Sequence, residues 1–404
     1  MREAFQPHLD WIATQAEHLR PTLLRLSNIN SGSFNVGGVR TVAEHVAALY
    51  EPLSPQIEWL TVAPYRASAD DGSRRERPLG PALRLRMHAD APLQVFVGGH
   101  LDTVFGIEHP FQNARELDAD TLAGPGVADL KGGLLVMWLA LMALERSPWR
   151  GRIGWEVLLN PDEEIGSAGS APLLREAAQR NHLGLIYEPA LPDGSLASAR
   201  KGSGNFELIV HGRAAHAGRN PEQGRNAIVA TATLIEAVQA LNGRRPGLTI
   251  NPGYVRGGGP LNVVPDRCIF KFNVRTTQAD DEAWLLDRLE QIRQSAPQDG
   301  FRYELRGGFS RPPKPISPPM QRLMDWISDC GRELGTDIRY QATGGCCDGN
   351  NLAAYGLANL DNLGVVGRDI HSDQETMRYS SLAERAQVSA LLLMKMASRQ
   401  LQWV

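Results

Sequence analysis

Three short apolar runs, separated by helical sequence, constrain the fold of this chain most. They are LQVFVGG (93–99), RIGWEVLL (152–159) and GLIYEP (184–189), and each has the length of one buried strand. A strongly apolar helical segment lies between the first two runs, from about Leu130 to Glu145. Buried strands that alternate with helices are typical of a mostly parallel sheet covered on both faces, so we predict an α/β fold.

The pattern changes near Lys201 and defines a second domain. Strand-like and helical segments now follow one another as strand, helix, strand, strand, helix, strand, which predicts an inserted ferredoxin-like α+β domain. The proline-rich stretch RPPKPISPP (311–319) then suits a domain boundary. We therefore expect one α/β domain, formed by residues 1–200 and 312–404, to be interrupted by a domain at 201–311.

Further elements are expected at the two ends of the chain. The N-terminal sequence predicts a helix over about 5–26, and the polar stretch 68–80 predicts an exposed loop. After the boundary, the pattern predicts a helix at 320–334, a strand at 363–367 and a final helix from about Ser381.

Composition narrows the classes of partner. The net charge of -3 and the absence of a basic stripe predict no nucleic-acid partner. The longest apolar run, Leu134–Leu144, is shorter than the ~20 residues that span a bilayer, so no membrane partner is expected. The first 15 residues lack the apolar stretch of a signal peptide, which predicts a cytoplasmic protein. The four cysteines show no CxxC spacing, so a metal would have to bind histidines and carboxylates.

Histidines and carboxylates follow the predicted strands at the points where the strands end. Because the carboxyl ends of parallel strands lie at one edge of a sheet, these side chains are expected to converge there. Imidazole and carboxylate donors without thiolate suit zinc, with cobalt or manganese as substitutes. The residues concerned are His100, Asp102, Asp129, Glu163, Glu164, Glu188 and His371.

Taken singly, each of these residues has a simpler interpretation. His100 and His371 could be hydrogen-bonded structural histidines, Asp129 could be a helix N-cap, and Glu188 could be a turn residue. Glu163 and Glu164 could be a solvated loop pair. Their joint placement favours a metal site, because none of these interpretations predicts the others.

The motifs GGHLDTV, GPGVADLKGG, NPDEEIGS, GRAAHAG and HSDQE occur in the order found in the co-catalytic zinc aminoacylase/carboxypeptidase family. The resemblance covers nearly the whole chain. The stretches LNVVPDRCIFKFNVR and TGG..DG look most like those of bacterial glutamate carboxypeptidases. The resemblance implies a zinc-hydrolase catalytic domain, a lid/dimerisation domain at 201–311, and a homodimer.

It also implies two zinc ions per subunit. His100, Asp129 and Glu188 would hold one ion. Asp129, Glu164 and His371 would hold the other, with Asp129 bridging. Asp102 would accept a hydrogen bond from the second ring nitrogen of His100 and fix its tautomer.

The same resemblance assigns the catalytic and substrate-binding roles. Glu163 would be the general base that takes a proton from a metal-activated water and passes it to the leaving amine. His216 would reach a partner subunit's site and stabilise the oxyanion. Substrate would be bound by Arg275, which would clamp a free α-carboxylate, and by Asn262, Gly344 and Gly345. Without the resemblance, His216 and the four residues named for substrate binding would be interpreted as ordinary surface or turn residues.

One departure from the family pattern concerns specificity. Cys346 and Cys347 stand where relatives carry small or hydroxyl residues, so they either alter the side-chain pocket or pack inertly.

Taken together, the motifs predict a dizinc hydrolase of glutamate-carboxypeptidase type, which releases a C-terminal amino acid from a small peptide. The alternatives are an N-acyl-amino-acid deacylase or desuccinylase, a catalytically silent metal-binding protein of this fold, and a single-metal or manganese hydrolase of unrelated fold.

Overall fold

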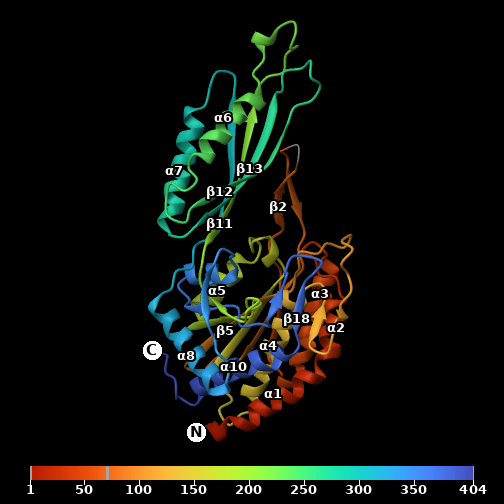
Figure 1. The fold of residues 1–404 in the computed structure, drawn as a ribbon, viewed down its shortest axis with the longest axis vertical. Coiled ribbons are helices and arrows are strands. Elements are labelled where there is room, and N and C mark those ends of the chain that lie inside the picture. The colour runs from red at the N-terminus through yellow and green to blue at the C-terminus, as the bar shows by residue number, and fades with distance from the viewer. Residues whose placement is uncertain (1, 70–71, 404) are drawn as a thin grey trace.

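The computed structural model describes residues 2–69 and 72–403 and divides the chain into two stacked parts (Figure 1). The larger part, at the bottom of the view, contains a six-stranded sheet. Its strands in spatial order are β1 (Gln56–Leu60), β4 (Ala82–Met87), β8 (Gly154–Asn160), β5 (Gln94–His100), β9 (Leu183–Ile186) and β16 (Asn359–Leu360). β8, β5, β9 and β16 run parallel to one another, and β4 runs antiparallel to both of its neighbours, β1 and β8. The predicted α/β fold with a mostly parallel sheet is therefore confirmed.

Helices cover both faces of this sheet because the sheet is apolar on both. One face packs on α1 (Gln6–His18), α2 (Arg20–Ser27), α3 (Val36–Tyr50), α4 (Gly133–Glu145), α8 (Pro318–Leu334) and α10 (Ser380–Ala397). The other face packs on α5 (Ala171–Arg180) and α9 (Asp348–Ala354). The segment 127–145 is long and apolar enough to cross a membrane, but all of it is buried in this core.

The N-terminal segment forms two helices where one was expected. Pro21 lies in the first turn of α2, and the helix axis breaks at Leu19. Proline removes a backbone donor and clashes with the preceding turn, so it begins a new helix more readily than it continues an old one.

The upper part is the inserted domain. Its elements are β11 (Gly202–His211), α6 (Ala227–Gln239), β12 (Thr249–Gly257), β13 (Arg267–Thr276), α7 (Asp280–Ser295) and β14 (Arg302–Arg311). The four strands form an antiparallel sheet in the order β12-β13-β11-β14, and both helices lie on one face of it (Figure 1). This is the predicted ferredoxin-like arrangement, and we call the domain the lid.

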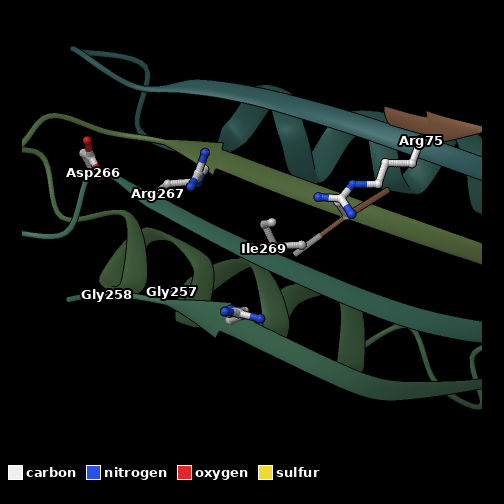
Figure 2. Close-up of a pocket in the computed structure, with 8 residues that line it drawn as sticks. Arg75, Gly257, Gly258, Asp266, Arg267 and Ile269 are labelled. Carbon is white, nitrogen blue, oxygen red and sulfur yellow. The ribbon is translucent and has the colours of Figure 1, made fainter. Parts of the chain in front are cut away.

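The stretch 68–80 was expected to be an exposed loop, but it contributes to a hairpin of β2 (Tyr65–Ser68) and β3 (Arg74–Arg77). The hairpin rises from the lower part to the lid, where Arg306 donates a hydrogen bond of 2.7 Å to the carbonyl of Gly72. Beside this contact lies a cavity of about 410 Å³, lined by Arg75, Arg256 and Arg267 among others (Figure 2). The hairpin therefore contacts the lid in addition to the two chain connections that enter and leave it.

The predicted strand at 363–367 is wrong. The structure has β16 before it and β17 (Gly367–Arg368) at its end, and the residues between run beside the chain that follows β9. Gly364 lies so close to that chain that a side chain would meet the carbonyl oxygen of Tyr187 at 2.4 Å. Close backbone packing therefore replaces a regular ladder here.

Short strands complete the lower part. β17 pairs with β18 (Thr376–Arg378), which pairs with β7 (Thr121–Ala123), and β7 pairs with β6 (Arg115–Glu116). β10 (Leu196–Arg200) pairs with β15 (Tyr340–Thr343). The first of these sheets holds the loop of His371 over the edge of the central sheet.

Candidate metal centre

The carboxyl ends of β5, β8 and β9 bring the predicted ligands together. His100 is the last residue of β5 and lies opposite Asn160, the last residue of β8. Glu163 and Glu164 follow β8 in a single helical turn, and Glu188 follows β9 by two residues. Because these strands are parallel neighbours, all four side chains reach one edge of the sheet.

Asp129 reaches the same place from the turn before α4. Its backbone is not helical, with φ of -113° and ψ of 86°, and Gly132, not Asp129, caps α4. The N-cap interpretation of Asp129 is therefore wrong, and the helix begins at Gly133 and not near Leu130. The bent turn points the Asp129 carboxylate at the two histidines.

Asp129 lies between His100 and His371. Its Oδ1 is 3.1 Å from Nε2 of His100, and its Oδ2 is 3.2 Å from Nε2 of His371. Nε2 of His371 is also 3.0 Å from Oε2 of Glu164. One carboxylate thus turns one oxygen toward each histidine, which is the arrangement that a bridging ligand between two metal ions requires.

Glu188 completes the set of carboxylates. It is buried and lines a cavity of about 220 Å³ together with Asp129, Glu163 and His371. Its charge acts on His100. Three of the five predicted ligands, Asp129, Glu188 and His371, therefore line one cavity.

The electrostatics of this cavity favour bound cations. Burial, followed by repulsion from Asp129, raises the pKa of Glu164 to about 8. Burial and the charges of Glu163 and Asp129 raise the pKa of Glu188 well above its usual range. Hydrogen bonds to Asp129 and Glu164 raise the pKa of His371 to about 11. Carboxylates crowded and buried in this way favour bound positive charge.

The residues present therefore fit two divalent ions. Oε1 of Glu164 is buried and meets no hydrogen-bond partner among the described residues, so it is available as a ligand atom. Ligand atoms of His100, Asp129 and Glu164 all lie within 4.8 Å of one another. The donors are imidazole nitrogens and carboxylate oxygens, which suit zinc and similar transition metals.

Asp102 is placed beside His100 but makes different bonds from those expected. Nδ1 of His100 is 2.9 Å from the backbone oxygen of Asp102 and 3.4 Å from its carboxylate. The carboxylate instead accepts hydrogen bonds from the backbone N–H groups of Glu163 and Glu164, at 3.1 and 3.2 Å. Asp102 therefore ties the strand end of His100 to the two-glutamate turn.

Glu163 points into the same cavity as the ligands. Burial raises its pKa to about 7, against the opposing charge of Arg311, whose Nη2 lies 2.6 Å from Oε1 of Glu163. A carboxylate with a pKa near neutrality suits a general base at physiological pH.

The substrate residues divide into two groups along the lid. The strand register pairs Thr276 with Gly202, so Arg275 lies at the end of the lid that joins the lower part. There Nη1 of Arg275 donates to Sγ of Cys346 at 3.2 Å. Gly345 lines the 220 Å³ cavity, whereas the neighbouring Gly344 is exposed.

His216 and Asn262 lie at the opposite end of the lid. His216 follows the far end of β11, and its neighbour Ala217 donates a backbone hydrogen bond to the carbonyl of Asn262. Both residues are exposed. A strand as long as β11 spans ~30 Å, so within one chain these residues do not reach the metal ligands.

Three residues of the site were not predicted. Glu375 is buried and accepts hydrogen bonds from the backbone N–H groups of Gly126, Ala128 and Asp129. Arg311 and Asp348 form a buried ion pair of 2.8 Å. Glu375 and Asp348 stand within motifs quoted above, but short motifs do not show which partner a carboxylate has. Nothing in its local sequence distinguishes Arg311.

Fold and site together define a two-metal hydrolase with a lid. Residues 198–300 match the family model described as the peptidase dimerisation domain of the M20 family. The chain is 29% identical over 311 residues to carboxypeptidase G2 from Pseudomonas sp., covering 74% of this chain and 73% of that protein. It is 26% identical to a succinyl-diaminopimelate desuccinylase from Gluconobacter oxydans, and the match covers 77% of this chain and 85% of that protein.

A solved structure agrees in fold over nearly the whole length. It is a dinuclear metal-binding peptidase of the M20 family from Bacillus subtilis, with a TM-score of 0.61 and 15% identity. The match covers 96% of this chain and 99% of that one. The predicted resemblance to the metallopeptidases and related hydrolases of the M20 family is therefore confirmed.

Proposed function

We propose that the protein is a homodimeric dizinc hydrolase that cleaves the amide bond to a C-terminal amino acid, with glutamate as the preferred residue. The observation that carries this proposal is the placement of Asp129 between His100 and His371, with Glu163 in the same cavity. Similarity to carboxypeptidase G2 supports the substrate class.

In this proposal the chain provides both metal sites and the base. His100, Asp129 and Glu188 would hold one zinc ion, and Asp129, Glu164 and His371 the other. Bound zinc would polarise the scissile carbonyl and acidify a water molecule. Arg311 holds Oε1 of Glu163, so Oε2 is the oxygen that takes the proton and later delivers it to the leaving nitrogen.

The lid would select the substrate. Arg275 lies at the end of the lid nearest the cavity, where a guanidinium can bind the free α-carboxylate in a bidentate manner. The partner subunit's His216 would stabilise the oxyanion, since His216 and Asn262 are too far from the metal ligands of their own chain. The match to a dimerisation domain supports this arrangement.

A deacylase or desuccinylase is the second candidate, and Arg200 is compatible with it as well as with the first. Arg200 lines the cavity, and its guanidinium is held by Asp361 and Asn362 at 2.9 and 2.7 Å. A fixed positive charge there suits a second carboxylate, whether it belongs to a glutamate side chain or to a succinyl group. Similarity to desuccinylases agrees with the latter.

A substrate panel tests the proposal. Zinc-loaded protein is assayed by ninhydrin on N-acyl-glutamates, other N-acyl amino acids, N-succinyl amino acids and dipeptides. We expect release of glutamate from N-acyl-glutamates to have the highest kcat/KM, and we expect Glu163→Gln protein to lose nearly all of this release. Preferential cleavage of succinyl substrates would replace the carboxypeptidase with the desuccinylase. Absence of hydrolysis across the panel would contradict both.

A further inference from the structure

Arg311 joins the proposed catalytic base to the lid. It is the last residue of β14, the strand by which the chain returns from the lid, yet its side chain is only 4% exposed and lies inside the larger domain. We infer that Arg311 is a positioning residue for the general base: it fixes the carboxylate of Glu163 in the cavity. This inference rests on the proposed function, because Glu163 is the base only in that function.

The guanidinium holds Glu163 at two places. Nη2 of Arg311 donates to the side-chain Oε1 of Glu163 at 2.6 Å and to its backbone oxygen at 2.9 Å. A glutamate side chain turns about three bonds, and a donor shared between its two ends leaves few rotamers open. The contact therefore determines where the second oxygen, Oε2, points.

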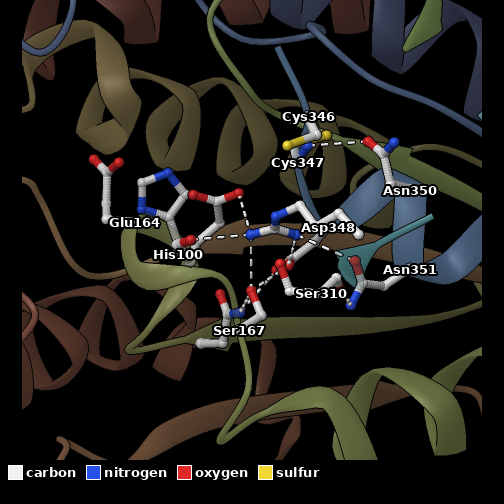
Figure 3. A network of polar contacts seen from close by, with 12 residues as sticks. His100, Glu164, Ser167, Ser310, Cys346, Cys347, Asp348, Asn350 and Asn351 are labelled. Carbon is white, nitrogen blue, oxygen red and sulfur yellow. Dashed lines mark hydrogen bonds and ion pairs between the residues drawn. The ribbon is translucent and has the colours of Figure 1, made fainter. Parts of the chain in front are cut away.

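The other end of the guanidinium is anchored independently. Nη1 donates to Oδ1 of Asp348 at 2.8 Å, and Oδ2 of Asp348 accepts a hydrogen bond of 2.7 Å from Asn160 (Figure 3). Ser167 lies in the same buried network and accepts from Nη2 at 3.0 Å. Because the planar fork of arginine reaches two carboxylates in fixed directions, lysine would replace it only in part.

The backbone of Arg311 is fixed by the strands that connect the domains. Arg311 pairs with Ser203 of β11, and three residues further on Lys314 exchanges two backbone hydrogen bonds of 2.9 and 3.0 Å with Arg200. The two connections between lid and catalytic domain thus form one paired ribbon. The base is held by a residue of the ribbon that carries the lid.

A purely structural role is the competing explanation. Glu163 and Asp348 are both buried, so Arg311 could serve only to neutralise them. The two explanations differ for a variant that removes the charge of Asp348 together with that of Arg311. Such a variant removes the buried charge of Asp348 that Arg311→Gln leaves unpaired, but it does not regain the grip on Glu163.

The experiment compares Arg311→Gln, Arg311→Lys and the double variant Arg311→Gln/Asp348→Asn with wild type. We expect Arg311→Gln to lower kcat about 10²-fold with little change in KM, since a base displaced by ~1 Å loses about that much. Arg311→Lys should recover part of the loss. The double variant should melt at a higher temperature than Arg311→Gln, while its kcat stays low.

Arg302→Gln is the matched control, since Arg302 lies on the same strand but is exposed. It should keep wild-type kcat, and elemental analysis should find equal zinc in all variants. Recovery of kcat in the double variant, to within about 3-fold of wild type, would show that Arg311 only neutralises charge.

A crystal structure of the zinc-loaded double variant gives a readout that does not depend on turnover. We expect the Glu163 carboxylate to have left the position that it takes in the wild-type protein. An unchanged position would overturn the inference. If wild type hydrolyses no substrate of the panel, the proposed function fails, and the position of Glu163 still decides what Arg311 does.

Discussion

The carboxylate of Asp102 accepts a hydrogen bond of 3.1 Å from the backbone N–H of Glu163. The ends of β5 and β8 are thereby joined, and the backbone of Glu163 is fixed relative to His100. Arg311 fixes the side chain of the same glutamate. The two contacts fix the backbone and the side chain of Glu163 independently of Glu164.

Glu163→Gln should leave zinc binding intact and remove nearly all turnover. Glutamine has the size of glutamate but cannot take a proton, and a general base contributes about 10²- to 10⁴-fold to a rate. The measurements are kcat and zinc content per subunit. Near-normal kcat would exclude Glu163 as the base, and loss of zinc would make it a ligand.

Arg275→Ala should raise KM for substrates that have a free α-carboxylate and should change KM little for the corresponding amides. The reason is that a charge-assisted hydrogen bond is lost only for the free acids. Arg267→Ala is the control, because Arg267 lies at the far end of the same strand. An equal effect on acids and amides would exclude the clamp.

His216 should act across the subunit interface. Dimers of His216→Ala and dimers of Glu163→Gln should each be nearly inactive. In a mixed dimer, one of the two sites combines the intact Glu163 of the His216→Ala chain with the intact His216 of the Glu163→Gln chain. Random exchange of subunits should therefore restore about a quarter of wild-type activity. Activity that does not return on mixing, although exchange is shown by mass spectrometry, would contradict the shared site.

Removal of metal should lower the melting temperature. The carboxylates of Asp129, Glu164 and Glu188, whose side chains are buried, then repel one another without bound cations. A ligand at 100 times its Kd stabilises the folded state by about 2.7 kcal/mol per site, so zinc should restore the melting temperature in a concentration-dependent way. Calorimetry with chelator and then with added zinc checks this. Identical melting curves would contradict a metal centre at this place.

Asp162→Asn should stabilise the protein more at pH 7.5 than at pH 5. Burial raises the pKa of Asp162 to about 6, against ~3.9 in the unfolded chain, so the folded state holds the proton more tightly. The protonated Asp162 therefore stabilises the folded state by up to about 3 kcal/mol, an effect that is complete below the unfolded pKa of ~3.9. This stabilisation is lost as the pH rises through 6.

Asparagine has no such dependence. Denaturant unfolding of both proteins at the two pH values gives the difference. An equal effect of the substitution at pH 5 and pH 7.5 would show that Asp162 titrates normally.

The sequence by itself determined the order of the elements and the identity of the metal-site candidates. Apolar runs of strand length specify β5, β8 and β9 because a strand buried on both faces has to be apolar throughout. His100, Glu164 and Glu188 could be found because they follow such runs directly, and parallel neighbours end at the same edge. The change of pattern near Lys201 similarly predicted the lid.

Only the tertiary structure decided the partners of these side chains. Arg311 lies 148 residues from Glu163 in sequence, and Glu375 lies 246 residues from Asp129. No local pattern encodes such contacts, because they depend on how the lid ribbon and the C-terminal loop pack against the sheet. The prediction of a strand at 363–367 was wrong for the same reason. The backbone of these residues is determined by close packing against the chain after β9 and not by strand propensity.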